Sequence, residues 1–319
     1  MRVAVTGGAG NVGSHLVDAA LREGAREVVA LDALVRGTPE NLRAALPSGR
    51  VRFLTLDIRD AAAVREAIAG CDVVFHQAAL RWTRCQEAPR ECQEVMVDGT
   101  FNVAEAAVSG GVRRLVFASS ALVYGDPRRL PLDEDHPLDG STMYAAAKIA
   151  GEQLLRAMQR VSTLHVANLR YFNVYGPRMD IRSKYVEVMV RWLNLIDEGR
   201  PLTLFGEGLQ SADFVYVGDV VEANLRAAVA DAPFVTANVC SGSETRMRDL
   251  AGLLLELTGS TAGVTHQPEA PGSLPARRVG DPERAERELG FRAETTLREG
   301  LMALIDWRAA ELATAAAIA

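Results

Sequence analysis

The sequence has few cysteines, and their spacing carries no metal-binding or disulfide pattern. Cys71, Cys85, Cys92 and Cys240 are the four cysteines among 319 residues, and no two of them form a CxxC pair. No histidine pattern accompanies them, so a zinc site is not supported, and neither is the disulfide framework of a small secreted protein. We therefore expect reduced thiols and no metal site.

The sequence also lacks an excess of basic residues and a long apolar run. Lys and Arg number 35 against 41 Asp and Glu, which gives a formal net charge of -6. This balance argues against a nucleic-acid-binding surface. The apolar stretch Leu250 to Leu257 is too short to span a bilayer, and the N-terminus predicts a strand rather than a targeting segment. We expect a cytoplasmic protein whose ligand is small, with neither nucleic acid nor a membrane as partner.

Apolar runs of strand length alternate with helical patterns along the first part of the chain. The runs lie at 3–5, 28–31, 51–54, 73–75, 115–118 and 164–169, and the helical patterns at 12–23, 61–69 and 99–109. This alternation predicts an α/β fold with a Rossmann-type, doubly wound parallel sheet. The pattern becomes less regular after about residue 176, where a helix at 186–196 is followed by short strands. This change predicts a smaller C-terminal lobe over the carboxyl edge of the sheet.

A glycine-rich turn follows the first predicted strand directly and opens the first helix. Gly7, Gly10 and Gly13 leave room for a pyrophosphate to approach the backbone, and the helix N-terminus at Asn11 and Val12 supplies unpaired N–H donors. A tight turn without a ligand is the alternative, but the position between strand and helix favours a dinucleotide site.

Asp32 ends the second predicted strand, about 20 residues after the glycine turn, where a carboxylate can accept both adenosine ribose hydroxyls and repel a 2′-phosphate. This position predicts NAD rather than NADP, with Arg36 nearby as the residue that could weaken the preference. We therefore expect an NAD-binding Rossmann domain at 1–172. The rest of the chain, 173–319, would be mainly a substrate-binding lobe, with some segments returning to the first domain.

Tyr144 and Lys148 lie four residues apart in a helical pattern, so their side chains share a face. The ammonium can favour the charged form of the phenol, which lowers its pKa and makes Tyr144 a candidate base. The spacing alone is a weak signal, because a solvated tyrosine beside a surface lysine has the same pattern. Together with the glycine turn, it predicts a nicotinamide-dependent enzyme.

Eight motifs in order give the chain a resemblance to a known family. It resembles an extended short-chain dehydrogenase/reductase of the NAD-dependent nucleotide-sugar epimerase/dehydratase family, and its motifs are most similar to those of UDP-glucose 4-epimerase-like proteins. The motifs cover nearly the whole chain: Thr6 to Gly10, Asp32, Asp57-Ile58, His76 to Ala79, Ser119 to Gly125, Tyr144 to Lys148, Arg170 to Arg178, and Asp213 to Val217.

The resemblance implies a tightly held NAD, a nucleoside-diphosphate sugar between the lobes, with a UDP-sugar as the first choice, and a homodimer joined through helices near 98–109 and 144–160. It also implies a catalytic triad of Ser120, Tyr144 and Lys148. The expected cofactor-binding residues are Gly7, Gly10, Asn11, Val12, Gly13, Asp32, Asp57, Ile58, Gln77, Ala78, Ala79, Arg81, Tyr144, Lys148 and Tyr171.

The family chemistry implies a role for each member of the triad. Ser120 would donate to the reacting oxygen, Tyr144 would take the C4 hydroxyl proton while hydride leaves C4, and Lys148 would bind the nicotinamide ribose. Hydride return to the other face of a 4-keto intermediate would give the C4 epimer. The family's 4,6-dehydratases carry Asp-Glu just after the triad residue, whereas this chain carries Ala121-Leu122, which disfavours elimination.

The substrate contacts depart from the family pattern. Many relatives read Arg-Asp-Phe, with the Arg on the diphosphate, where this chain has Ala212-Asp213-Phe214, and a second Arg expected near Pro271-Gly272 is missing. Other cations could replace these two bidentate contacts. Arg84 could bind a sugar carboxylate, with a solvated surface arginine as the alternative. The expected substrate-binding residues are Ser120, Tyr144, Asn173, Arg84, Arg178, Arg182 and Arg277.

Two other functions remain open on the sequence. One is an NAD(P)-dependent reductase or dehydrogenase of a sugar nucleotide or another hydroxylated substrate. The other is a non-catalytic, dinucleotide-sensing regulator with the same fold. Such regulators commonly lack the active tyrosine, whereas Ser120, Tyr144 and Lys148 are all present here.

Overall fold

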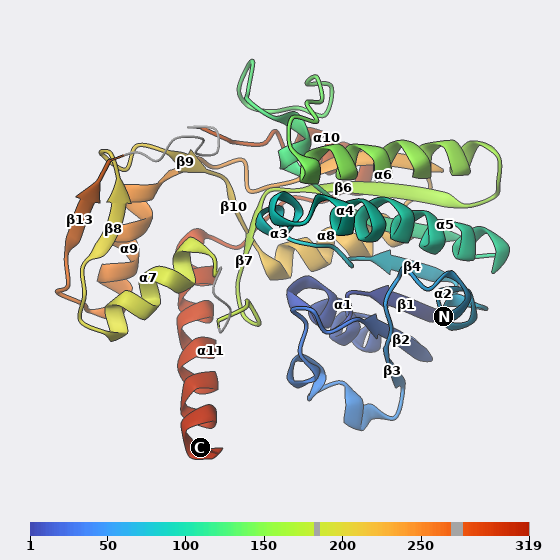
Figure 1. Cartoon of the computed structure of the whole chain (residues 1–319), viewed down its shortest axis with the longest axis horizontal. Coiled ribbons are helices and arrows are strands. Elements are labelled where there is room, and N and C mark those ends of the chain that lie inside the picture. The colour runs from blue at the N-terminus through green and yellow to red at the C-terminus, as the bar shows by residue number, and fades with distance from the viewer. Residues whose placement is uncertain (182–185, 269–276, 319) are drawn as a thin grey trace.

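A parallel sheet of seven strands forms the centre of the molecule (Figure 1). The computed structural model describes residues 1–181, 186–268 and 277–318. In spatial order the strands are β11 (Phe234–Val239), β6 (His165–Tyr171), β5 (Arg114–Ser120), β4 (Val73–His76), β1 (Arg2–Thr6), β2 (Glu27–Asp32) and β3 (Val51–Thr55). The chain order reverses beside β1, between β4 and β2. In such sheets this switch point is where ligands bind, at the carboxyl ends of the strands.

Helices cover both faces of the sheet, so its strands are apolar on both sides. Val3 and Val5 of β1 pack in one hydrophobic cluster, and Ala4 between them packs in another. The first face carries α1 (Asn11–Arg22), α8 (Val217–Val229) and α10 (Glu283–Leu289). The second carries α2 (Ala61–Ile68), α5 (Gly99–Ser109) and α6 (Met143–Arg160).

A second lobe stands beside the sheet and has a core of its own. It contains α7 (Val188–Asp197), α9 (Met247–Thr258), α11 (Leu297–Ile318) and the parallel pair β8 (Leu202–Phe205) and β13 (Val264–Gln267). Trp192, Leu202, Leu254 and Leu301 are buried in this core. Within the described residues, no helix combines the length and apolar composition that a membrane crossing requires.

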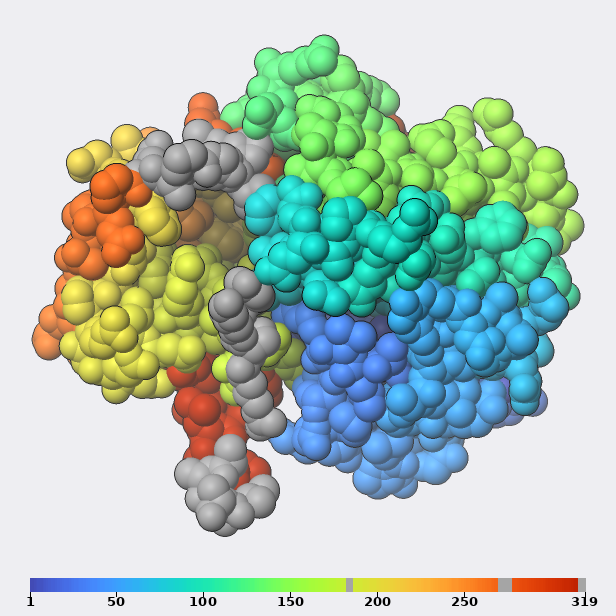
Figure 2. Space-filling model, in the orientation of Figure 1, coloured from blue at the N-terminus to red at the C-terminus, as the bar shows by residue number. Residues whose placement is uncertain are grey.

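Short strand pairs and ion pairs connect the two parts of the molecule. β7 (Asn173–Tyr175) pairs with β10 (Phe214–Tyr216), and β9 (Ser211–Ala212) pairs with β12 (Thr245–Arg246). α3 (Trp82–Glu87) and α4 (Pro89–Gln93) follow β4, and Arg81 at the start of α3 forms an ion pair with Glu187 at the start of α7. In the space-filling view the cyan surface of α3 and α4 therefore lies beside the yellow second lobe (Figure 2).

The structure confirms the predicted doubly wound parallel sheet. The helix predicted at 99–109 matches α5, and the helix predicted at 186–196 begins two residues later, as α7. The sheet has a seventh strand, β11, that the sequence patterns did not identify. Three elements that follow residue 172 belong to the Rossmann part of the molecule: β11 is a strand of the sheet, and α8 and α10 pack on it.

Candidate active site

The glycine turn forms one end of a cavity of about 630 Å³ at the carboxyl edge of the sheet. Gly7 has a φ of +67°, and a Cβ at Gly13 would collide with the carbonyl oxygen of Gly7. Gly10 is the N-cap residue of α1, so no side chain caps the helix, and the first turn of α1 has no acidic residue. The glycine turn therefore leaves room for a phosphate, and the N–H groups of the first turn of α1 face it without a side-chain cap.

Asp32 lies in the same cavity, at the end of β2. Its Oδ2 accepts a hydrogen bond of 3.0 Å from Ala9 N, and its Oδ1 accepts one of 2.8 Å from Leu34 N. Burial raises the pKa of this carboxyl, and the backbone hydrogen bonds oppose the shift. Each oxygen keeps a second lone pair, so the carboxylate can still accept ribose hydroxyls.

Asp32→Ala is expected to relax the preference for NAD over NADP by about tenfold or more, because it removes a negative charge that a 2′-phosphate would meet. Titration of apoprotein with each dinucleotide measures the ratio. Asp32→Asn is the matched control for the backbone contacts, because its amide oxygen can still accept one of the two N–H groups. An unchanged affinity ratio in both variants would show that Asp32 is not the selector.

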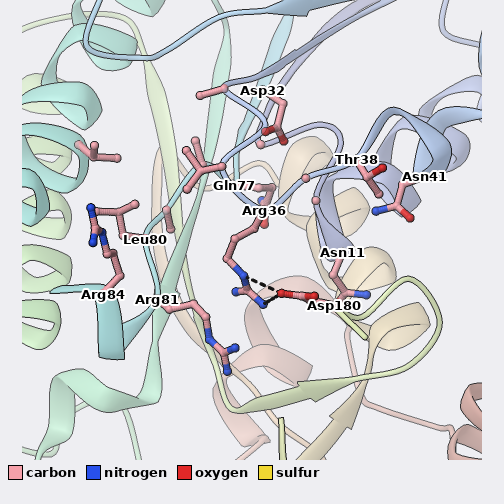
Figure 3. A pocket seen from close by; sticks show the side chains of 18 of the residues that line it. Asn11, Asp32, Arg36, Thr38, Asn41, Gln77, Leu80, Arg81, Arg84 and Asp180 are labelled. Carbon is pink, nitrogen blue, oxygen red and sulfur yellow. Dashed lines mark hydrogen bonds and ion pairs between the residues drawn. The ribbon is translucent and has the colours of Figure 1, made fainter. Parts of the chain in front are cut away.

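Arg36 also lines the cavity, but its guanidinium is paired with a carboxylate of the distant segment that follows β7. Its Nη2 lies 3.1 Å from Asp180 Oδ2, as the dashed lines in Figure 3 mark. A 2′-phosphate would have to compete with this carboxylate for Arg36.

Further walls of the cavity come from the ends of β3 and β4 and from α3. Asp57 pairs with Arg59, whose hydrogen bonds lower the pKa of the Asp57 carboxyl. Gln77 lies beside the glycine turn, and its Oε1 is 3.1 Å from the hydroxyl of Tyr171. Tyr171 thus stands behind Gln77 rather than on the cavity wall.

Ten of the predicted cofactor residues line the cavity together. They are Gly7, Gly10, Asn11, Asp32, Asp57, Ile58, Gln77, Ala78, Ala79 and Arg81. The lining does not include Val12, Gly13, Tyr144, Lys148 or Tyr171.

Ser120, Tyr144 and Lys148 come together at the carboxyl end of β5. Ser120 ends β5 and caps the 3-10 turn Ala121–Tyr124, its Oγ accepting a hydrogen bond of 3.2 Å from Leu122 N. Tyr144 and Lys148 lie in the first two turns of α6, which Thr142 caps through Ala145 N. The Tyr144 ring packs in a cluster with Leu80, which does line the cavity. The triad is thus adjacent to the cavity, and Leu80 lies between the Tyr144 ring and the cavity.

The electrostatics of the triad differ from the prediction. Burial raises the pKa of Tyr144 to about 12, although a hydrogen bond with Ser120 lowers it, so the expected lowering is not found. Burial also lowers the pKa of Lys148 to about 8. The Lys148 Nζ donates a hydrogen bond of 2.6 Å to Ala118 O and lies 5.8 Å from the centre of the Tyr144 ring. The ammonium is therefore directed at the backbone of β5. Desolvation, rather than the charge of Lys148, determines the direction of the Tyr144 pKa shift.

A buried charge network lies behind the triad, and the sequence analysis did not identify it. Glu152 follows Tyr144 and Lys148 on α6 at intervals of four residues, so the three share a face. Its carboxylate pairs with Arg170 of β6 at 2.7 Å and accepts a hydrogen bond of 2.5 Å from Ser119 Oγ. The helical spacing was the available signal for Glu152, and Arg170 already stood inside one of the motifs. This network fixes α6 to β5 and β6, and therefore holds the triad in place.

Three predicted substrate residues have partners within the chain. Asn173 Nδ2 donates a hydrogen bond of 3.0 Å to Asp213 O, at the junction of β7 and β10. Arg84 lines the cavity and lies 2.6 Å from Glu91. Arg277 lies 2.6 Å from Glu244, which also accepts a hydrogen bond from Ser211. Arg277 is therefore near Ala212, where the family arginine is missing.

Arg178, another predicted substrate residue, connects the segment after β7 to α1. Its Nη2 is 2.6 Å from Asp18 of α1, and the residue lines the same cavity as the glycine turn and Arg84. Asn11 and His15, on the same face of α1 as Asp18, both bond to Pro177 O. The segment after β7 is thereby held against the helix that follows the glycine turn. The predicted Arg182 lies outside the described residues.

The four cysteines are free and buried. Within 1–181, 186–268 and 277–318, no group of three or more His, Cys, Asp or Glu side chains is arranged to hold a metal ion.

Comparison with known proteins places this site in a family. Residues 3–240 match the model of the "NAD dependent epimerase/dehydratase family". A UDP-glucose 4-epimerase of Mycolicibacterium smegmatis is 36% identical over an alignment of 315 residues, and the match covers 96% of this chain and 98% of that protein. A dTDP-glucose 4,6-dehydratase of Streptomyces griseus is 33% identical over an alignment of 309 residues, and the match covers 95% of this chain and 92% of that protein.

A solved structure with bound cofactor is also similar. The UDP-glucose 4-epimerase of Thermus thermophilus, in complex with NAD, superposes with a TM-score of 0.85 and is 34% identical. The match covers 96% of this chain and 98% of that one.

Proposed function

Since the chain belongs to the NAD-dependent epimerase/dehydratase family, we propose that it is a 4-epimerase of a nucleoside-diphosphate sugar, with a UDP-sugar as the first substrate to test. The predicted cofactor, NAD, is confirmed by the family and by NAD-bound structures similar to this chain. The observation that carries the proposal is the convergence of Ser120, Tyr144 and Lys148 beside a cavity with the glycine turn and Asp32.

The bound NAD would accept a hydride from C4 of the sugar and return it, so that no net oxidation occurs. The turn of Gly7 and Gly10 would hold the diphosphate, and Asp32 the adenosine ribose. On the protein side, Ser120 would hydrogen-bond the C4 oxygen while Tyr144 takes its proton. Lys148 would stabilise the phenolate through its positive charge and exchange its bond to Ala118 O for a ribose hydroxyl.

Elimination and decarboxylation require a further acid or base beside the triad. Ala121 and Leu122 occupy the positions after Ser120, and neither side chain can transfer a proton. Relatives include a dTDP-glucose 4,6-dehydratase, and the family resemblance implies Asp-Glu at these two positions in such dehydratases. Ala121 and Leu122 therefore favour simple epimerisation.

The test is incubation of purified protein with UDP-glucose, UDP-galactose and other nucleotide sugars, without added nicotinamide, followed by NMR of the products. The proposal expects interconversion of C4 epimers and NAD that stays with the protein. Formation of a 4-keto-6-deoxy sugar or loss of a carboxylate would contradict it, as would a requirement for external NAD(P)H.

Turnover is expected to rise with pH and then to flatten above about pH 8. The raised pKa of Tyr144 leaves little phenolate at neutral pH, so its amount grows about tenfold per pH unit below that pKa. In the complex, the positive charge of oxidised nicotinamide would lower the pKa of Tyr144. The pKa of Lys148 is lowered to about 8, so the stabilising ammonium is lost above that pH.

A pH profile of kcat measures this dependence, and Lys148→Arg is the matched variant. Arginine keeps its charge throughout the range, so the residual turnover of this variant should continue to rise above pH 8. A flat wild-type profile, or the same flattening in Lys148→Arg, would contradict the assignment.

A further inference from the structure

Helix α11 belongs to the second lobe, yet two residues of its middle turns line the cofactor cavity. Trp307 and Glu311 are four residues apart on one face of α11, and both line the cavity of about 630 Å³. With Asn41 and Arg178, they also line a neighbouring cavity of about 250 Å³. α11 therefore supplies part of the wall that separates the two cavities. Figure 1 shows the helix extending away from its lobe toward the C-terminal end.

An ion pair connects this wall to the Rossmann domain. Arg43 donates from Nη2 to Glu311 Oε1; the side chain of Glu311 is 13% exposed and that of Arg43 is 59% exposed. Arg43 follows the 3-10 turn Pro39–Leu42, and Asn41 in that turn donates a hydrogen bond of 2.9 Å to Ala9 O. Glu311 is thus joined, through one short segment, to the glycine turn.

α11 is also fixed to the rest of its own lobe. Leu301 and Leu304 are buried in the lobe core. Arg308 Nη1 lies 2.6 Å from Asp197 Oδ2 of α7, and its Nη2 donates to Asn194 Oδ1 at 2.5 Å. Because Arg308 lies next to Trp307, these bonds hold the indole at the cavity wall.

We propose that Trp307 and Glu311 of α11 are cofactor-retaining residues: the indole covers one side of the bound dinucleotide, and the Glu311–Arg43 pair keeps the helix in that position. An indole gives a large, rigid apolar surface at little entropic cost, which suits contact with a sugar or base. The predicted contacts come from the first domain alone, so this part of the site is supplied by the second lobe. The inference holds whether or not C4 is the reacting carbon.

The experiment measures the release of NADH, a fluorescent probe, from preloaded protein after mixing with excess NAD in a stopped-flow instrument. Trp307→Leu is expected to release NADH about tenfold faster, because the ring contact is lost. Glu311→Gln and Arg43→Gln are each expected to release it about two- to fivefold faster, as for a partly exposed ion pair. The double variant should be no faster than either single one, since both remove the same interaction.

Arg298→Gln is the control on the same helix. Arg298 pairs with Glu256 at 2.8 Å, and it lines neither cavity, so NADH release should match the wild type. Trp307 is partly buried, so thermal unfolding of each variant accompanies the kinetics. If Trp307→Leu is unstable, the variants of the partly exposed ion pair, Glu311→Gln and Arg43→Gln, decide. Release within about 1.5-fold of wild type in Glu311→Gln and Arg43→Gln, or equal acceleration in Arg298→Gln, would overturn the proposal. Failure of epimerisation with faster release in these variants would overturn the proposed function alone.

Discussion

Tyr144→Phe is expected to lose about two to four orders of magnitude of turnover while it keeps NAD. The phenyl ring preserves the packing against Leu80, Cys85 and Cys92, but the variant has no hydroxyl to accept the C4 proton or to bond with Ser120. Turnover comes from NMR of the epimer products, and NAD content from the absorbance of the supernatant after denaturation. The loss in kcat should exceed any change in KM, because the hydroxyl acts on the reacting oxygen.

Tyr216→Phe is the matched control for the same atomic change in the second lobe. The Tyr216 ring packs against Tyr175, with ring centres 5.8 Å apart, and it is not among the residues that line the cofactor cavity. It should keep turnover within a factor of about two. If Tyr144→Phe itself kept turnover within a factor of about ten, Tyr144 would not be the base.

Arg170→Leu is expected to lower the free energy of unfolding by about 3–5 kcal/mol, because it leaves the Glu152 carboxylate buried without its partner. The two side chains are 5% and 3% exposed, and Arg170 Nη1 also donates to Tyr124 Oη and Glu134 O, at 3.1 Å each. Urea denaturation followed by circular dichroism measures the change.

Two further variants serve as controls for the stability loss expected in Arg170→Leu. Arg65→Ala removes a pair with Glu105 whose side chains are 58% and 46% exposed, and it should change stability by no more than about 0.5 kcal/mol. Replacing both members of the buried pair, as Arg170→Leu with Glu152→Leu, should recover part of the loss, because no charge then remains buried. A loss below about 1 kcal/mol in Arg170→Leu would show that solvent or protonation compensates the Glu152 carboxylate for its lost partner. The network would then not be what holds α6 in place.

Local patterns were enough to predict six of the seven strands of the sheet and the glycine turn at the cofactor end of the site. Strand-length apolar runs such as 73–75 are buried on both faces, and the glycine turn between β1 and α1 fixes where a diphosphate can approach. The spacing of Tyr144 and Lys148 placed both on one face of α6, as found. These features depend on contacts between near neighbours in sequence, which a pattern can encode.

Long-range partners could not be predicted in the same way. Arg178 pairs with Asp18, which lies 160 residues earlier, and Trp307 reaches the cofactor cavity only because α11 packs against α7. The pKa of Tyr144 depends on the burial of its ring among α3, α4 and α6, and this outweighs the effect expected from Lys148. Such effects arise from the packing of distant elements, so the sequence spacing alone contained no measure of them.

The most direct test of the account follows the hydrogen at C4. A UDP-sugar carrying deuterium at C4 is incubated with the NAD-loaded protein in ordinary water, and the epimer is analysed by NMR and mass spectrometry. Removal and return of hydride through the retained NAD predicts that the epimer keeps its deuterium at C4 and that no NADH accumulates at completion. An epimer with hydrogen from solvent at C4, or one equivalent of reduced cofactor for each sugar converted, would contradict the account.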